Sequence, residues 1–331
     1  MFEADSGPVA GTVRRRRAGR LSRVAIPIVG AVVTVLVASF ITFIALAFAP
    51  GDPVAQILGP HATEAQRAAM RVQLGLDHSV LTRYWDWLTG VLHGDLGLSL
   101  TYRQEVTALL GPRLGTSLML VAMSIVITVL AGIALGTFGG VSARWRPVVS
   151  GLAGLGIAIP GFVAATLLIS VFAVGLGWFP TYGAGSGFVD RLWHLALPSV
   201  ALSLAWSAYL AQITAASVKE EADKEHVATA IGRGLPWLVV IRRHVLRNAA
   251  TSVLTVSGLM VGGLVVGSVV IESAFAIDGI GSLLVKGVLN KDYAVVNAVS
   301  LIIVAIFVVV TALVDLLHTA LDPRLREGRR P

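Results

Sequence analysis

The sequence predicts an all-α polytopic membrane protein with six transmembrane helices. Of its 331 residues, 55% are hydrophobic and only 14% are charged, whereas a soluble domain carries charge on about a quarter of its residues. The mean hydropathy is +0.80. We therefore expect most of the molecular surface to meet lipid rather than water.

Six apolar stretches are long enough to cross a bilayer, which takes about 20 residues of helix. They are residues 24–49, 116–138, 148–178, 193–218, 251–274 and 296–317. Pro160-Gly161 interrupts the third stretch and Pro198 the fourth. Because proline removes a backbone donor, we expect both helices to kink at these points.

Lysine and arginine predict the orientation. With the N-terminus inside, the inner segments hold 18 of the 26 basic residues, although the first outer segment alone exceeds sixty residues. The positive-inside rule then places both termini on the inner side of the membrane. The run Arg14–Arg17 before the first stretch also resembles a signal peptide. The apolar run is longer than the 7–15 residues or so of such a core, so we expect an uncleaved anchor.

Composition excludes several classes of protein. Cysteine is absent, which excludes disulfides, thiolate metal sites and cysteine nucleophiles. The net charge is +7 and the pI about 10.2. Cationic flanks of membrane helices explain this charge better than a nucleic-acid partner does. We expect membrane lipid to contact most of the molecular surface.

The apolar stretches carry almost no ionisable residue between their ends; Asp315 and His318 lie near the inner end of the last one. Ion-driven carriers usually keep buried ionisable groups at mid-membrane. The chain has neither an H-E-x-x-H helix nor a G-x-x-x-x-G-K-[ST] phosphate loop. If it moves a solute uphill, a partner must supply the energy. A secondary carrier and a membrane-integral enzyme with a site at the inner interface remain the alternatives.

The outer segment 50–115 is the largest aqueous piece. It opens with the turn sequence Pro50-Gly51-Asp52-Pro53. From Glu64 to Leu92, apolar residues recur at helical spacing, which predicts amphipathic helices lying on the membrane or the bundle. Trp85 and Trp87 beside Tyr84 indicate an aromatic belt rather than a substrate-stacking site.

Glycines recur every four residues within the apolar stretches. The sets are Gly132, Gly136 and Gly140, then Gly258 with Gly262, and Gly263 with Gly267. Small residues at this spacing let helix backbones approach closely, so we interpret them as packing contacts rather than gating hinges.

The inner loop 219–247 predicts a helix–turn–helix that projects into the cytoplasm. Acidic residues lead a short helical stretch, which suits the positive end of a helix dipole. Gly232 and Gly234 are expected to end this helix, and Pro236 to stand in the first turn of a second one, over residues 237–245.

This loop resembles the inner-loop signature of ABC importer permeases, E-A-A-x3-G-x9-I-x-L-P. Ala228, Thr229 and Ala230 occupy its first three positions, counted back from Gly234. Ala228 stands where the signature has glutamate. The I, L and P positions are taken by His244, Leu246 and Arg247.

The loop is closer to the dipeptide/oligopeptide/nickel branch of that family, where T-A-x3-G-L and R-H-x-L-R-N recur. This chain has Thr229-Ala230, Gly234-Leu235 and Arg243-His244-Val245-Leu246-Arg247-Asn248. Glu225-His226 stands where the branch often has Asp-Tyr. Further motifs similar to the B-type permease of such systems are Pro50-Gly51-Asp52-Pro53, Gly94-Asp95-Leu96-Gly97, Gly279-Ile280-Gly281, Asp292-Tyr293 and Leu321-Asp322-Pro323-Arg324-Leu325-Arg326.

The resemblance implies the type I ABC importer (MetI-like) permease fold. Tails would span 1–23 and 319–331, with the first transmembrane helix at 24–49, the outer segment at 50–115 and the core at 116–318. The partners would be a second homologous permease, two ATP-binding subunits and an extracytoplasmic solute-binding protein. ATP and Mg would bind the partner subunits, and this chain would bind no cofactor and catalyse no reaction.

The resemblance also implies which residues carry function. Contact with an ATPase would fall on Ala228, Thr229, Ala230, Gly234, Leu235, His244, Leu246 and Arg247. Pro160, Gly161 and Pro198 are the candidate kink and pathway residues. Glu272 and Asp278 could line a substrate entrance, although a solvated loop is the interpretation we favour. Peptides are the expected substrate, with nickel, glutathione-like compounds, opines and short saccharides left open.

Overall fold

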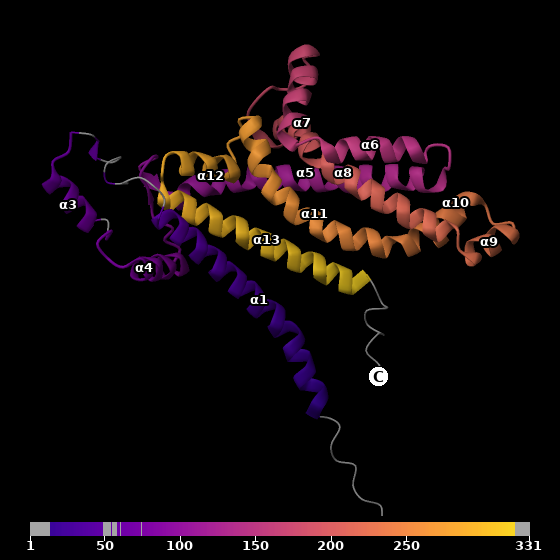
Figure 1. Cartoon of the computed structure of the whole chain (residues 1–331), viewed down its shortest axis with the longest axis horizontal. Helices are drawn as coiled ribbons and strands as arrows, with labels where there is room; N and C mark the ends of the chain where they lie inside the picture. Colours follow the sequence, from indigo (N-terminus) through magenta and orange to yellow (C-terminus); the bar gives the residue numbers. More distant parts are fainter. Residues whose placement is uncertain (1–13, 49–53, 55–57, 60, 74, 322–331) are drawn as a thin grey trace, which may run out of the picture.

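The computed structural model describes residues 14–48, 54, 58–59, 61–73 and 75–321, and these are overwhelmingly helical (Figure 1). The motif Pro50-Gly51-Asp52-Pro53 and all but the first residue of the 321–326 motif lie outside the described residues, as do the side chains of Asp315 and His318. Five helices are long and apolar enough to cross a membrane. They are α1 (Arg14–Ala47), α5 (Val106–Val141), α8 (Gly187–Ala222), α11 (Leu246–Ala274) and α13 (Tyr293–Leu321).

The third predicted span is a broken pair of helices. It consists of α6 (Arg146–Ala158), followed by α7 (Gly161–Leu168) and the π-helix η1 (Ile169–Gly175), with a bend of 102° between the two parts. Ile159 is extended (ψ 117°) and Pro160 precedes the first residue of α7, as expected because proline disfavours the helical conformation of the residue before it. The prediction of a kink at Pro160-Gly161 is confirmed.

The other predicted kink, at Pro198, does not interrupt its helix, and the kink itself stays a prediction. Pro198 is buried inside α8, which continues through it as one 36-residue helix. Helices α5, α6, α7 and α11 all pack on α8. This packing holds the helix together where proline alone would break it.

Glycines on α5 set its distance from α8. A Cβ added to Gly132 would lie 2.8 Å from side-chain atoms of Leu210, and one added to Gly136 would lie 2.6 Å from the backbone oxygen of Ala211. Gly140 meets Val218 in the same way. The four-residue glycine pattern therefore serves close helix packing, as predicted.

The described part of the segment 50–115 includes the helices α3 (Glu64–Gln73) and α4 (Val80–Leu92). Tyr84 on α4 is buried against α1, where its hydroxyl lies 2.9 Å from the Ser39 hydroxyl and its ring packs on Phe43. Trp85 is 64% exposed. The amphipathic helices are confirmed, and their aromatic side chains divide between an anchor on α1 and the outer surface.

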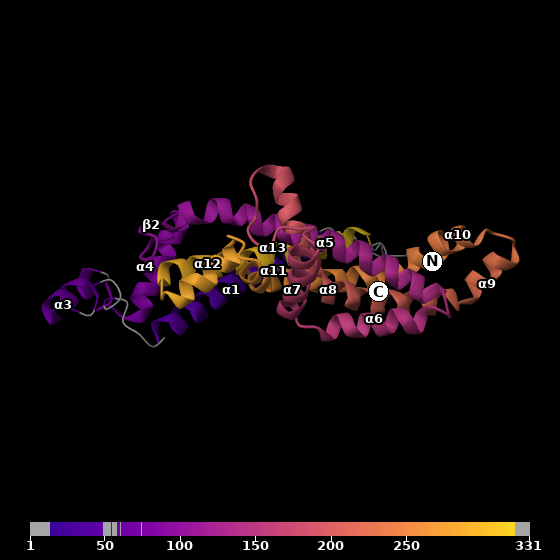
Figure 2. The ribbon, with the colours of Figure 1, turned by 90° about the horizontal axis from the view of Figure 1, so that it is seen from above.

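The two ends of the bundle carry different connections. A hairpin, β1 (Leu98–Ser99) and β2 (Gln104–Glu105), precedes α5 at one end. Helix α12 (Ile280–Leu289) also lies at this end (Figures 1 and 2). At the opposite end, α9 (Glu225–Gly232) and α10 (Trp237–Val240) project beyond the long helices.

Candidate functional site

The connection between α8 and α11 forms the projecting end of the molecule. Helix α8 runs to Ala222, and after two intervening residues α9 begins at Glu225. The predicted boundaries were wrong in three respects. The acidic residues before 222 end α8 rather than lead α9, Pro236 precedes α10 rather than opening its first turn, and α10 passes through η2 (Ile241–Val245) directly into α11.

Gly234 ends α9 in a Schellman motif. Its φ is +77°, a conformation that glycine adopts without the Cβ strain of other residues. The Gly234 amide donates to the Ile231 carbonyl at 2.9 Å, and the Leu235 amide donates to the Ala230 carbonyl at 3.3 Å. This is the hydrogen-bond pattern of that cap, and it confirms the predicted helix stop.

A small apolar core fixes α9 and α10 to the bundle. Its buried members are Val218, Val227, Ala230, Val240, Val245 and Ala249. They come from α8, α9, α10, η2 and α11, so each element of the connection contributes at least one side chain. The projecting end is thus a packed unit rather than an open loop.

The predicted ATPase-contact residues divide by exposure. Ala228, Thr229, Gly234 and Leu235 are exposed along α9 and its end. Ala230 is buried in the apolar core described above, so its side chain supports the helix from inside. At the junction of η2 with α11, Arg247 is exposed, whereas His244 and Leu246 are half-buried.

Glu221 is a residue of this region that the sequence did not single out. Its side chain is 8% exposed and its Oε1 accepts a hydrogen bond of 2.8 Å from Asn248 Nδ2 on α11. Lys224 Nζ donates to Oε2, and His226 Nε2 lies 3.3 Å from Oε1. One carboxylate at the end of α8 therefore has partners in the turn, on α9 and on α11.

The bend at Pro160-Gly161 borders an apolar cavity of about 260 Å³. Gly161 and Phe162 line it from the bend, Trp206 from α8 and Ile271 from α11. All of its described lining residues are uncharged. Of the three candidate kink and pathway residues, Gly161 lines this cavity, whereas Pro160 and Pro198 are not among its lining residues.

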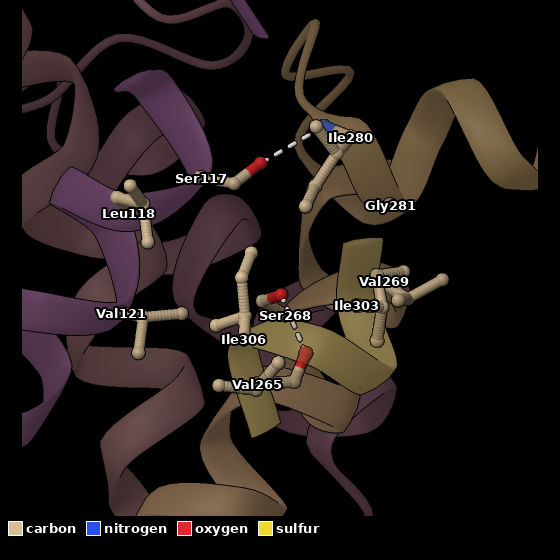
Figure 3. Close-up of a pocket in the computed structure, with 10 residues that line it drawn as sticks. All are labelled: Ser117, Leu118, Val121, Val265, Ser268, Val269, Ile280, Gly281, Ile303 and Ile306. Atoms are coloured by element: carbon tan, nitrogen blue, oxygen red, sulfur yellow. Dashed lines mark hydrogen bonds between the residues drawn. The ribbon is translucent and has the colours of Figure 1, made fainter. Parts of the chain in front are cut away.

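The end of the bundle that carries the hairpin and α12 contains a buried carboxyl group. Glu272 is fully buried near the end of α11, so its assignment to a solvated loop was wrong. Ser117 on α5 donates to its Oε1 at 2.6 Å, and the Ser282 amide in the first turn of α12 donates to Oε2 at 3.0 Å. Ser117 in turn accepts from the Ile280 amide at 2.9 Å, beside a small pocket between α5, α11, α12 and α13 (Figure 3).

Asp278 behaves as the solvated residue that was expected. Its side chain is 57% exposed, with Arg113 Nη2 at 2.9 Å and Lys286 Nζ at 3.5 Å. Glu272 and Asp278 are six residues apart, yet the first is a packed internal contact and the second a surface ion pair. Neither lines the apolar cavity at the bend.

Asp292 is a second buried carboxyl group at the same end of the bundle as α12. It accepts from the Ser99 hydroxyl at 2.6 Å and from the Thr101 amide at 3.0 Å, so it ties the hairpin to the start of α13. The motifs around Gly279-Ile280-Gly281 and Asp292-Tyr293 thus mark the two ends of α12.

Comparison with known proteins gives a consistent result along the chain. Residues 129–327 match the model of the family described as binding-protein-dependent transport system inner membrane component. Residues 22–121 match the model of the N-terminal part of such membrane components.

Individual relatives match over most of their length. A putative peptide transport system permease protein of Brucella abortus is 36% identical over 302 residues, which cover 89% of this chain and 96% of the relative. The glutathione transport system permease protein of Escherichia coli O6:H1 is 36% identical over 301 residues, covering 90% and 97%. A solved structure of the MetNI methionine ABC transporter matches with a TM-score of 0.56 at 16% identity, covering 65% of this chain and 96% of that chain. That likeness supports the fold alone.

Proposed function

Because the chain belongs to the family of inner membrane components of binding-protein-dependent transport systems, we propose that it forms half of the pathway of an ATP-driven importer for peptides. The other half would come from a second, homologous permease. Two ATP-binding subunits and an extracytoplasmic solute-binding protein would complete the system. The chain itself would bind neither ATP nor Mg and would catalyse no reaction.

The observation that carries this proposal is the packed end formed by α9 and α10. It projects beyond the ends of the long helices (Figure 1), and a small apolar core shared with α8 and α11 fixes it to them. It exposes Ala228, Thr229 and Leu235. A rigid projection of this kind can seat in a groove of an ATPase and follow its movement. We propose that the contact also includes Gly234, His244, Leu246 and Arg247, with Ala230 supporting it from beneath.

The membrane orientation follows from that assignment. If α9 and α10 meet a cytoplasmic ATPase, an even number of spans places the start of α1 and the end of α13 on the cytoplasmic side as well. The basic residues of the loop, among them Arg233, Arg242 and Arg243, then lie inside, in agreement with the positive-inside rule.

The proposed substrate class rests on the relatives and on the cavity at the bend. Relatives of about 36% identity are named for peptide or glutathione transport, and glutathione is itself a small peptide. The cavity beside Gly161 is lined by apolar side chains, which offer little to distinguish one peptide from another. This supports a system in which the binding protein selects the substrate.

The experiment that tests the proposal is purification of the chain in mild detergent from its native host, with mass spectrometry of the proteins that accompany it. We expect a second permease and one or two ATPases, and we expect Gly234→Arg to lose the ATPases while keeping the permease. Glu220→Gln, on the exposed side of α8 near the same loop, is the control and should retain all partners. Reproducible purification of the wild-type chain without any ATPase would contradict the proposal and favour an autonomous carrier.

A further inference from the structure

Glu221 is a charged group buried where three helices meet. Its carboxylate accepts hydrogen bonds from Asn248 on α11 and from Lys224 in the turn before α9. His226 Nε2 on α9 lies 3.3 Å from its Oε1. A buried carboxylate is costly unless donors compensate it. The cluster therefore forms only when α8, α9 and α11 hold one particular arrangement.

The network extends beyond the carboxylate itself. Asn248 Nδ2 also donates to the His244 carbonyl at 2.9 Å, within the π-helical stretch that joins α10 to α11. His226 and His244 face each other with ring centroids 6.4 Å apart. A polar chain thus runs from the end of α8, across the start of α9, to the start of α11.

The apolar core beneath α9 cannot do the same work. Contacts among Val218, Val227 and Val245 hold the elements together, but apolar contacts are non-directional and tolerate small rotations. Directional hydrogen bonds to a buried charge fix the angle between the elements. Loss of the polar cluster would leave α9 attached but free to turn relative to α8 and α11.

We propose that Glu221 is a positioning residue for energy coupling, which rests on the function proposed above. It locks α9 to the ends of both α8 and α11, so that movement of α9 by an ATPase displaces the two long helices together. Glu220, its neighbour, is exposed and takes no part in the cluster.

The test uses the complex purified from the native host and follows amide hydrogen exchange with and without ATP and Mg. In the wild type and in Glu220→Gln, we expect ATP to change protection at the end of α8 and the start of α11 together. Asn248→Asp places a second carboxylate 2.8 Å from the first, and it should reduce this ATP-dependent change at least about threefold, the scale on which contacting residues couple.

The double variant Glu221→Gln with Asn248→Asp supplies the decisive comparison. It restores one amide and one carboxylate to the pair with their positions exchanged, although the bond from residue 248 to the His244 carbonyl stays lost. It should therefore recover part of the response that Asn248→Asp loses. If each substitution only disturbed the structure at its own site, the double variant would lose more of the ATP-dependent response than either single variant. A double variant that responds to ATP more weakly than both single variants would overturn the proposal.

Two further outcomes separate this inference from the proposed function. If the wild-type complex contains no ATPase, the proposed function fails. If ATPases remain bound and Asn248→Asp responds to ATP like the wild type, only the role of Glu221 fails. Should Asn248→Asp not assemble, Glu221→Gln alone decides, because an amide has one acceptor oxygen where the carboxylate has two, and it carries no negative charge. An unchanged response in that variant also overturns the proposal.

Discussion

Ser117 on α5 donates a hydrogen bond of 2.6 Å to the fully buried Glu272 on α11. An equivalent bond of 2.6 Å joins Ser99 to Asp292, which follows α12. Helix α12 thus lies between two buried carboxyl groups, each bound by a serine, one on α5 and the other in the hairpin that precedes α5. Hydrogen bonds between separate segments therefore hold together the end of the bundle that carries α12, which is not a set of independent loops.

Ser117→Ala should destabilise the chain through the groups it leaves behind. The substitution removes the partner of Glu272 Oε1 and also the acceptor of the Ile280 amide. A buried polar group without its partner costs about 1–3 kcal/mol. We expect a loss of that size in the free energy of unfolding, measured on the purified chain in detergent.

Ser124→Ala is the matched control for this substitution. Ser124 is buried on the same helix, but its hydroxyl bonds only to the Leu120 carbonyl one turn earlier. Its removal leaves no group of another helix unpaired, so the loss should be clearly smaller. Equal losses for the two variants would show that the bond to Glu272 contributes nothing beyond a local contact.

Asp278→Asn should have a small effect that depends on salt. Asp278 pairs with Arg113 and Lys286, but its side chain is 57% exposed. Exposed ion pairs contribute at most about 1 kcal/mol, and salt screens them. Unfolding midpoints of wild type and variant should differ slightly at low ionic strength and converge at high ionic strength. A large difference that persists in high salt would assign Asp278 a role other than a surface pair.

What the sequence could predict depends on the range of the interaction. The bend at Pro160 and the helix end at Gly234 follow from the backbone chemistry of the residue itself, and both are confirmed. Pro198 has the same local chemistry as Pro160, yet packing on four helices carries α8 through it. The intrinsic preference of a residue is decisive only where its neighbours do not oppose it.

The burial of Glu221 and Glu272 could not be predicted from the sequence. Glu221 meets Asn248, 27 positions along the chain, and Glu272 meets Ser117, 155 positions away. No local pattern distinguishes Glu272 from Asp278 or Glu221 from Glu220, since each pair is close in sequence and alike in charge. Only the packing of separate helices decides which member loses its water and gains partners.

Gly136→Ala should weaken the packing of α5 on α8. The added methyl group would lie 2.6 Å from the Ala211 backbone oxygen and would also overlap the Thr214 side chain. Because a backbone atom cannot rotate away, the helices must separate, and overpacking of this kind costs about 1–3 kcal/mol. We expect a lower unfolding midpoint for the purified variant.

Gly115→Ala is the control on the same helix. A Cβ at Gly115 meets no atom within 4 Å, and alanine favours a helix over glycine by up to about 1 kcal/mol. This variant should be as stable as the wild type or slightly more so. If Gly136→Ala proved equally harmless, the glycine stripe would not determine the spacing of α5 and α8.

Gly234→Ala should loosen the end of α9 without adding a steric clash. Nothing lies within 4 Å of a Cβ at this position, but the φ of +77° costs an L-residue about 1–2 kcal/mol. The cap bonds of the Gly234 and Leu235 positions should open more often, so their amides should exchange faster with deuterium. A smaller fraction of the molecules would then have α9 in the conformation that we propose an ATPase binds. Less ATPase should therefore co-purify.

Gly232→Ala separates the conformational effect from the loss of a glycine. Gly232 lies in the last turn of α9, and a Cβ there is equally unobstructed. Alanine suits this helical position better than glycine does, so exchange at the cap and recovery of ATPase should match or exceed the wild type. Faster exchange in both variants, or in neither, would show that the left-handed conformation of Gly234 is not what holds the end of α9.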